Sequence, residues 1–162
     1  MFDGPLGVAV KTLTKQEAQQ WCQQRGIPQD DQRRPVRPVG VAEFKIPVDA
    51  GQRVALVSNQ FEALREAPEI LVWCTSWGVW PSGERPHIFQ RLRASYGETR
   101  GLSEVPAQTF DGSEYDDALS FVVLGVLFLW DIMVVGGVGQ SILSYSHDEF
   151  GWLGVSGRRT SA

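Results

Sequence analysis

The sequence predicts a single α+β domain with a small sheet. Its 162 residues fit one domain that can bury a sizeable core. Apolar residues make up 43% and charged residues 21% of the chain, as in an ordinary globular protein. Segments with helical spacing alternate irregularly with short apolar segments. We expect about four to five strands in a mixed or antiparallel sheet, packed by helices of which one is very apolar. The domain should span residues 1–154, with a disordered tail at 155–162.

The first elements follow from capping and spacing signals. A short strand is expected over residues 6–11. Thr14 and Glu17 have the spacing of a capping box, which predicts a helix that continues at helical spacing and ends at Gly26 (Ala18, Trp21 and Cys22). Residues 29–40 are polar and contain prolines, so they are interpreted as a loop whose arginines form a solvated face (Arg33, Arg34 and Arg37).

The next three elements are separated by prolines. Alternating apolar and polar residues at 41–46 predict a half-buried strand. Asp49 can cap a helix that carries one apolar stripe and ends before Pro68 (Val54, Val57, Phe61 and Leu64). The unbroken apolar run 69–75 then predicts a buried strand.

Pro86 suits the first turn of a third helix. Four apolar residues of this helix fall on one face (Ile88, Phe89, Leu92 and Tyr96), and three polar residues are expected to point elsewhere (Gln90, Arg91 and Arg93). Gly97 is a natural end of the helix. Residues 98–112 are interpreted as a long irregular connection.

Ser113 or Asp116 can cap the most apolar helix, which should continue to about Trp130. Two short strands are expected at 132–135 and 141–145. Ser146 and Glu149 have the spacing of a second capping box, so a final helix is expected to begin there, with the flanking aromatics as a hydrophobic staple (Tyr145 and Phe150).

The net charge and the hydropathy pattern indicate which classes of partner and which cellular location to expect. The net charge of −4 argues against nucleic acid as the main partner. Asp131 and the glycines after it interrupt the longest apolar run, which favours a core helix over a membrane span. No signal-peptide pattern is visible at the N-terminus, so a cytoplasmic location is expected. Cys22 and Cys74 are expected to be buried free thiols. No cofactor motif is present, and no cofactor is predicted.

Three residues are candidates for catalysis, although none is assigned a catalytic role. His147 lies beside Asp148, and such a carboxylate can tune a histidine into a general base or a ligand. Helix initiation at Ser146 is the simpler interpretation of this segment. Asp131 closes the most apolar run, so its carboxylate must reach water or find an arginine or a backbone amide. His87 and His147 could share a zinc ion with nearby acids, but the spacing matches no zinc motif and no metal site is predicted.

Three tryptophans fall within eight residues, at Trp73, Trp77 and Trp80. We expect Trp73 in the core, whereas Trp77 and Trp80 either pack inward or wait for a partner. The predicted binding residues surround this run and the helix after it (Trp77, Trp80, Glu84, His87, Arg91, Arg93 and Tyr96). In one alternative, Trp77, Trp80 and Tyr96 line a pocket in which Arg91 or Arg93 recognises an anion.

Three segments carry a resemblance. They are 77–84 (WGVWPSGE), 93–97 (RASYG) and 146–150 (SHDEF). In this order they resemble a group of small bacterial proteins with the motifs W-G-x-W-P-S-x-E, R-x-S-Y-G and S-H-D-E-W, for which no activity is established. The resemblance covers roughly residues 42 to 153, and this chain departs from it at Phe150. It implies a bacterial cytosolic protein and no mechanism.

Three function classes remain open on the sequence. The first is a non-enzymatic adaptor or immunity-type protein that binds another protein, supported by the aromatic run and the acidic total charge. The second is a hydrolase or metal-assisted enzyme that uses His147, Asp148 and His87, with Asp131 as a further candidate. The third is a domain that binds a small anionic ligand. The oligomeric state does not follow from the sequence.

Overall fold

The protein is built on one open antiparallel sheet of seven strands. The structure, a computed structural model, describes residues 10–37, 41–78, 86–137 and 141–155. The strand order is β1-β4-β3-β5-β6-β7-β2, and every neighbouring pair is antiparallel. The strands are β1 (Lys11–Leu13), β2 (Ala42–Lys45), β3 (Glu69–Ser76), β4 (Ala107–Asp111), β5 (Asp131–Gly136), β6 (Ser141–Tyr145) and β7 (Phe150–Val155). The predicted α+β class is confirmed, with more strands than expected.

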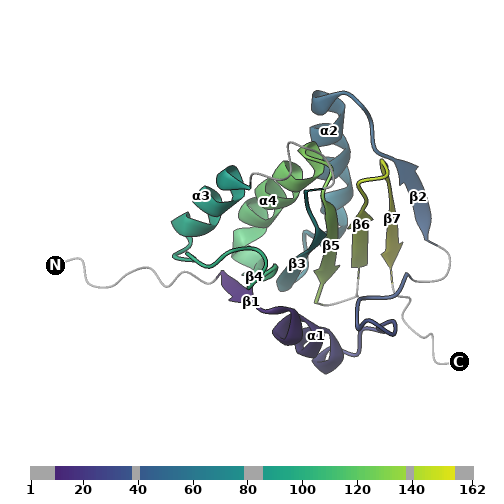
Figure 1. Ribbon diagram of the computed structural model, residues 1–162. Helices are drawn as coiled ribbons and strands as arrows, with labels where there is room; N and C mark the ends of the chain where they lie inside the picture. The colour runs from purple at the N-terminus through teal and green to yellow at the C-terminus, as the bar shows by residue number, and fades with distance from the viewer. Residues whose placement is uncertain (1–9, 38–40, 79–85, 138–140, 156–162) are drawn as a thin grey trace, which may run out of the picture.

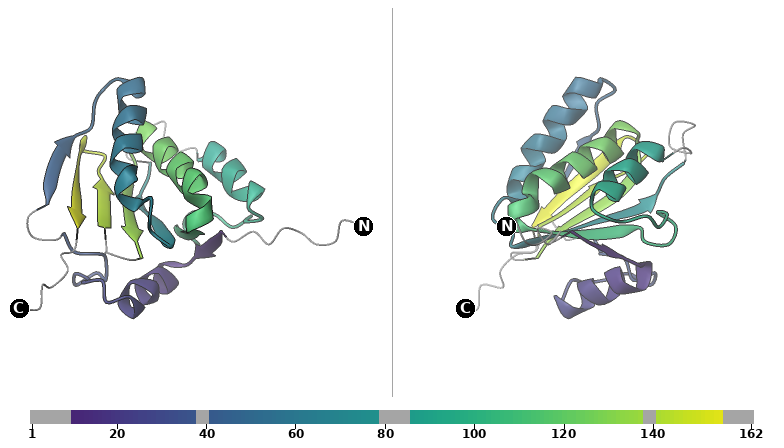
Figure 2. Two further views of the ribbon diagram at one scale, coloured as in Figure 1. Left: turned by 180° about the vertical axis from the view of Figure 1, so that it is seen from behind. Right: turned by 90° about the vertical axis from the view of Figure 1, so that its left-hand side faces the viewer.

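Four α-helices lie on the two faces of the sheet in unequal shares (Figures 1 and 2). Three of them cover one face, called here the helical face: α2 (Ala50–Phe61), α3 (His87–Ser95) and α4 (Tyr115–Leu127). Among the described residues, only α1 (Lys15–Gln24) covers the other, called the α1 face, where it lies beside β1 and β4. No helix of the described part of the chain lies over the part of the α1 face formed by β6, β7 and β2.

The helical face holds the larger core. Phe89 of α3 stacks on Trp130 with ring centroids 3.8 Å apart, and it meets the edge of Phe121 of α4 at 5.4 Å. Gly125 allows α4 to lie close to the sheet, since an added Cβ would be 2.0 Å from Cδ1 of Ile132. Aromatic side chains at such distances bury much apolar area and gain favourable ring contacts. The three helices are thus fixed by dense packing.

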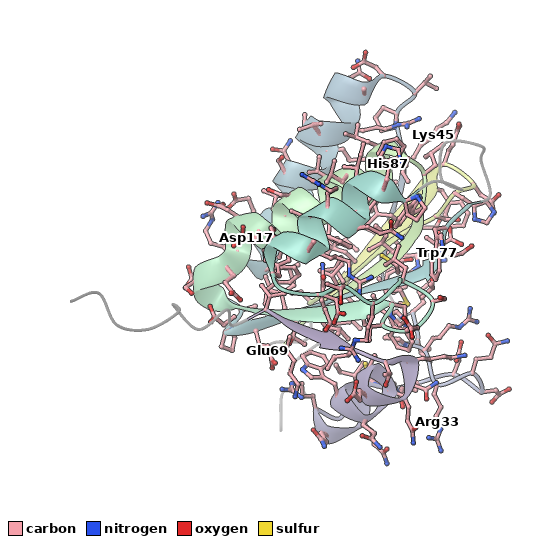
Figure 3. The ribbon with its side chains drawn as sticks, turned by 60° about the vertical axis from the view of Figure 1, so that its left-hand side comes forward. Arg33, Lys45, Glu69, Trp77, His87 and Asp117 are labelled. Atoms are coloured by element: carbon pink, nitrogen blue, oxygen red, sulfur yellow. The ribbon has the colours of Figure 1, made fainter. Side chains whose placement is uncertain are left out.

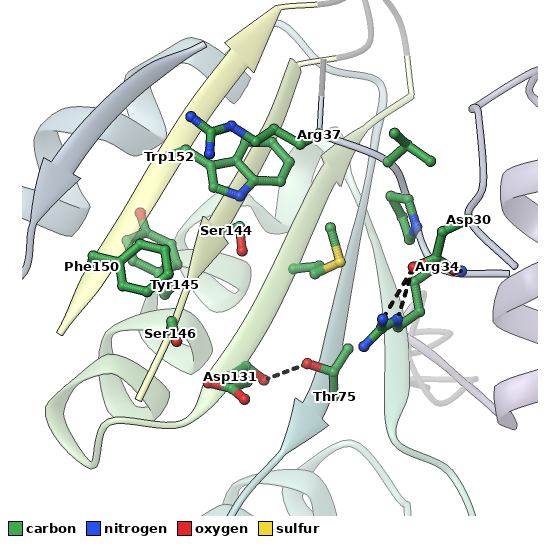
Figure 4. Close-up of a pocket in the computed structure, with 13 residues that line it drawn as sticks. Asp30, Arg34, Arg37, Thr75, Asp131, Ser144, Tyr145, Ser146, Phe150 and Trp152 are labelled. Carbon is green, nitrogen blue, oxygen red and sulfur yellow. Dashed lines mark hydrogen bonds and ion pairs between the residues drawn. The ribbon is translucent and has the colours of Figure 1, made fainter. Parts of the chain in front are cut away.

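The α1 face has a smaller core. The Thr14–Glu17 capping box is present, so the predicted start of this helix is confirmed. The helix buries Ala18, Trp21 and Cys22, which belong to one cluster with Trp73 of β3. Beyond that cluster the chain returns as an irregular segment, whose residues 30–37 lie over the middle strands (Figure 4).

Most of the other predicted elements are also confirmed. Asp49 caps α2 by accepting a hydrogen bond from the backbone N of Gln52. The strands expected at 41–46, 69–75, 132–135 and 141–145 are present, and Trp73 is buried as expected. Cys22 and Cys74 are buried free thiols, and burial raises their pKa values to about 11 and about 12.

The predicted irregular connection at 98–112 is wrong, because it contains β4. This strand lies between β1 and β3, and its polar Gln108 and Thr109 are both buried. Because these two buried residues are polar, the sequence of β4 lacks the unbroken apolar run that is typical of a buried strand. The expected strand at 6–11 is also shifted, since β1 begins at Lys11 and residues 6–9 lie outside the described residues.

The predicted helix at Ser146 is wrong as well. Residues 146–149 form the turn of the β6–β7 hairpin, closed by Ser146 N donating to Phe150 O at 2.9 Å and Glu149 N donating to Ser146 O at 3.1 Å. The Ser146 hydroxyl accepts from the backbone N of Asp148, as a capping serine would. However, Glu149 has a φ of 63°, which ends the turn where a helix would continue. A capping-box pattern and a three-residue hairpin loop therefore share the same residues.

Two further details differ from expectation. Neither Ser113 nor Asp116 caps α4; instead Asp111 and Glu114 form a capping box on a 3₁₀ turn that leads into it (Gly112–Glu114). The helix ends at Leu127, before Trp130. Among the described residues no helix is long and apolar enough to cross a membrane.

Candidate functional site

The half-covered α1 face contains an open hollow of about 360 Å³, called here the main hollow (Figure 4). It lies between the strands β5, β6 and β7 and the segment 30–37. Alternation along the strands places every second side chain on this face, since successive residues of a strand point to opposite sides. Its lining is Asp30, Arg34, Pro35, Val36, Arg37, Thr75, Asp131, Met133, Ser144, Tyr145, Ser146, Phe150 and Trp152.

The middle of the main hollow is apolar. Met133 and Trp152 are buried, whereas Phe150 and Val36 are 46% and 39% exposed. Only five large apolar side chains among the described residues are exposed in this way, and two of them line this one hollow. The hollow is thus a place where apolar surface stays in contact with water.

Ion pairs lie at the edge of the main hollow. Arg34 donates to one carboxylate oxygen of Asp30 through Nε at 3.2 Å and Nη2 at 3.1 Å, and Arg37 pairs with Glu43 of the edge strand β2. Both arginines are exposed, so these pairs add little stability. They do hold two guanidinium groups beside the apolar middle.

Asp131 and His147 form a hydrogen-bonded pair at one end. Nδ1 of His147 lies 2.8 Å and 3.0 Å from the two oxygens of Asp131, and the backbone N of His147 donates to the same carboxylate at 2.7 Å. Asp131 thus meets the predicted need for a backbone amide. The hydrogen bond to Asp131 raises the pKa of His147 above its usual 6.5.

This pair could orient a general base, because a carboxylate on Nδ1 leaves Nε2 to accept a proton. Nε2 instead lies 3.4 Å from the carboxylate of Asp148. Within the described part of the chain no serine or threonine hydroxyl hydrogen-bonds to the ring, and no three His, Cys, Asp or Glu residues are placed to hold a metal. The predicted enzyme residues are therefore only partly brought together, since His87 lies on α3, across the sheet.

A second hollow of about 240 Å³, called here the side hollow, adjoins the first, because Arg34 and Thr75 line both. Its lining is Lys15, Gln32, Arg34, Trp73, Cys74, Thr75, Trp77, Ser103 and Pro106. Lys15 and Arg34 are cations, and none of the nine residues is acidic. The side hollow is thus the more positive of the two.

The tryptophan run has a mixed outcome. Trp77 is half-buried and packs against Trp130, with ring centroids 6.3 Å apart, while it also lines the side hollow. Figure 3 shows Trp77 just beyond the end of β3, at the opposite end of that strand from Glu69. Trp80 and Glu84 lie outside the described residues. The predicted pocket of Trp77, Trp80 and Tyr96 with Arg91 or Arg93 stays a prediction. Neither Tyr96 nor either arginine is among the residues that line the side hollow.

Two predicted binding residues do share a groove along α3. His87 and Arg91 are both exposed and line a shallow hollow of about 390 Å³ with Arg100 and Glu98. Arg100 hydrogen-bonds to Glu98 and holds the pKa of that carboxyl at about 2. Glu98 offsets the charge of Arg100, so the net positive charge of this groove is that of Arg91.

Arg93 and Tyr96 have structural roles. Arg93 was expected to point away from the core, but it is 2% exposed and its Nη2 donates to the carbonyl of Val105 at 2.7 Å. Its Nε and Nη1 have no hydrogen-bond partner among the described residues. Tyr96 packs edge-on against Phe110, and burial raises its pKa to about 12.

Sequence reasoning missed most of the residues that line the main hollow. The sequence predicts Arg34 and Arg37 only as part of a solvated face, assigns Phe150 to the start of a helix, and gives no role to Trp152. The repeated spacing of polar and aromatic residues in 144–152 is a strand signal that could have found them (Ser144, Ser146, Phe150 and Trp152). The glycines at 151 and 154 obscured that signal.

Comparison with known proteins gives no match to this chain among family models, curated proteins or solved structures.

Proposed function

We propose that the protein binds a segment of another polypeptide in the main hollow and acts as an interaction protein rather than as an enzyme. The observation that carries this proposal is the apolar surface left uncovered between the segment 30–37 and the strand β7. The exposed side chains of Val36 and Phe150 line that surface.

The shape of the hollow favours a polypeptide over a free small molecule. Small-molecule sites enclose most of their ligand, typically about 70–90% of its surface. The main hollow is open to solvent along its length, so it would leave a small ligand largely in water. A polypeptide can place one side chain in the hollow and cover the edges with its neighbours.

The arrangement of residues also matches a protein interface. Such interfaces have an apolar centre that is rich in aromatic residues and a polar, arginine-bearing rim. Here Trp152, Met133 and Phe150 lie at the centre, and the Arg34–Asp30 and Arg37–Glu43 pairs lie at the edge. The occupant that fits is a segment with a large aliphatic or aromatic side chain for the centre and hydrogen-bonding groups for the edge.

Site-specific photocrosslinking tests the proposal. A photoreactive phenylalanine analogue is placed at Phe150 in the full chain, and the matched control carries it at Ile88, which is 43% exposed on α3. We expect one polypeptide to be captured at Phe150 and not at Ile88. With that polypeptide purified, Val36→Ala should weaken binding by about tenfold, as expected for a contact residue near the interface centre. Equal capture at both positions, or no capture at Phe150, would overturn the proposal.

A further inference from the structure

We infer that the side hollow binds a carboxylate carried by the same partner segment. This inference rests on the proposed function and names the chemistry of the partner: an apolar side chain in the main hollow, followed by an acidic residue. The two hollows share Arg34 and Thr75, so a short segment can occupy both.

The charges of the side hollow favour an anion. Lys15 is exposed, and no ion pair of its ammonium group is present among the described residues. Arg34 uses Nε and Nη2 for Asp30, which leaves Nη1 for a ligand. No acidic residue lines this hollow, in contrast to the main hollow, which contains Asp30 and Asp131. Because Asp30 offsets the charge of Arg34, the net positive charge that a carboxylate meets in the side hollow is that of Lys15.

Neutral donors complete the site. Gln32 and Ser103 line the hollow. Neither the side-chain amide of Gln32 nor the hydroxyl of Ser103 is used in another hydrogen bond among the described residues. Carboxylates bind tightly where charged and neutral donors converge, because each oxygen accepts two hydrogen bonds. Trp77 forms an apolar wall, which limits water around those bonds.

The buried Arg93 behind the lining adds positive potential. Cys74 lines the hollow and lies near this arginine, whose guanidinium has two unpartnered donors among the described residues. Arg93 is not free to reach the ligand, but it raises the local potential that an anion meets. The positive end of the α1 dipole adds little, because the Glu17 carboxylate of the capping box already lies there.

The experiment uses the ¹⁵N-labelled full chain and three acetylated, amidated tripeptides that differ only at the last residue. They are leucine-glycine-aspartate, leucine-glycine-asparagine and leucine-glycine-phosphoserine, each titrated at millimolar concentration. We expect the aspartate peptide to shift the indole N–H signals of Trp73 and Trp77 and to bind several-fold more tightly than the asparagine peptide. Added salt should remove this preference, since the contact is near the surface.

Matched variants separate the two hollows. Lys15→Gln should weaken the aspartate peptide by about two- to fivefold, as for an exposed charge contact, whereas Lys11→Gln, an exposed lysine outside both hollows, should leave it unchanged. Phe150→Ala should weaken the binding of all three peptides by the same factor.

The inference is overturned if the aspartate and asparagine peptides bind equally, or if Lys15→Gln and Lys11→Gln have the same effect. A preference for the phosphoserine peptide would also overturn it and assign the hollow to phosphate. If the acid gives no advantage but Phe150→Ala still weakens binding, the proposed function stands without the carboxylate. Binding that depends on Lys15 but not on Phe150 would instead contradict the proposal that the main hollow binds the partner.

Discussion

Helices cover the two faces of the sheet to different extents. The helical face is covered by α2, α3 and α4, and its aromatic side chains interlock around Phe89. The α1 face has one helix at one end and an irregular segment over its middle. Its outer strands expose Phe150, a side chain of the type that the helical face buries. The difference predicts that the helical face contributes the larger share of the stability, while the α1 face keeps apolar surface in contact with water.

The largest expected effect lies on the helical face. Phe89→Ala removes a ring that stacks on Trp130 and meets Phe121 and Phe128. Because little of the surroundings can collapse into the gap, we expect a loss of about 3–5 kcal/mol in the free energy of unfolding. Urea denaturation measures it. A loss below about 1 kcal/mol would show that this face is not the stable half.

A smaller effect is expected at the turn between β6 and β7, whose backbone is strained at Glu149. Glu149 has a φ of 63°, a conformation that glycine adopts without the clash of a Cβ. We expect Glu149→Gly to raise the free energy of unfolding by about 0.5–1 kcal/mol, because relief of the clash exceeds the added entropy of the unfolded chain. Glu149→Ala keeps the Cβ and serves as the control. If Glu149→Ala raised the free energy of unfolding as much as Glu149→Gly, backbone strain at this position would not be the cause.

The Asp131–His147 pair makes the stability of the same turn depend on pH. Since the folded pKa of His147 lies above 6.5, the stabilisation is complete below pH 6.5 and is lost as pH rises through the folded value. The wild-type protein should therefore exceed His147→Gln in stability most clearly at mildly acidic pH. Urea unfolding over a pH series measures this difference. It should vanish in an Asp131→Asn background, and a difference that grows with rising pH would be inconsistent with the pair.

The smallest expected effect is at Arg93, the polar exception within the helical face. Arg93→Met removes a buried charge but also leaves the carbonyl of Val105 without its donor. These changes oppose each other, so the free energy of unfolding should change by less than about 1 kcal/mol. Thermal unfolding tests this expectation. A loss above about 3 kcal/mol would mean that the guanidinium has a charged partner beyond the described residues.

The sequence was informative wherever local signals and tertiary packing agree. The caps at Thr14 and Asp49 and the apolar run of β3 were predictable for this reason. The sheet was underestimated because β4 has buried polar residues and β7 has two glycines, so neither shows a clean period of two. The chain segments around Ser146 satisfy a helix cap and a hairpin turn equally well, and only the pairing of β6 with β7 decides between them.

The candidate site was less predictable than the fold. Its residues come from three regions that lie far apart in the sequence: the segment 30–37, Thr75 of β3, and the consecutive strands β5, β6 and β7. Pairs such as Asp131 with His147 depend on strand register, which sequence periodicity does not specify. Trp77 lines a surface hollow, but the sequence predicted none of the other residues that line it.

We propose that the α1 face binds a partner polypeptide and that the helical face provides most of the stability of the fold. The most direct measurement is the affinity of the polypeptide captured at Phe150 for two variants, Phe150→Ala and Ile88→Ala, with unfolding measured on the same samples. Both side chains are similarly exposed, so both variants should change the free energy of unfolding by less than about 0.5 kcal/mol. We predict that Phe150→Ala weakens binding by about tenfold or more and that Ile88→Ala leaves it unchanged. Equal affinities, or a loss only at Ile88, would contradict the account.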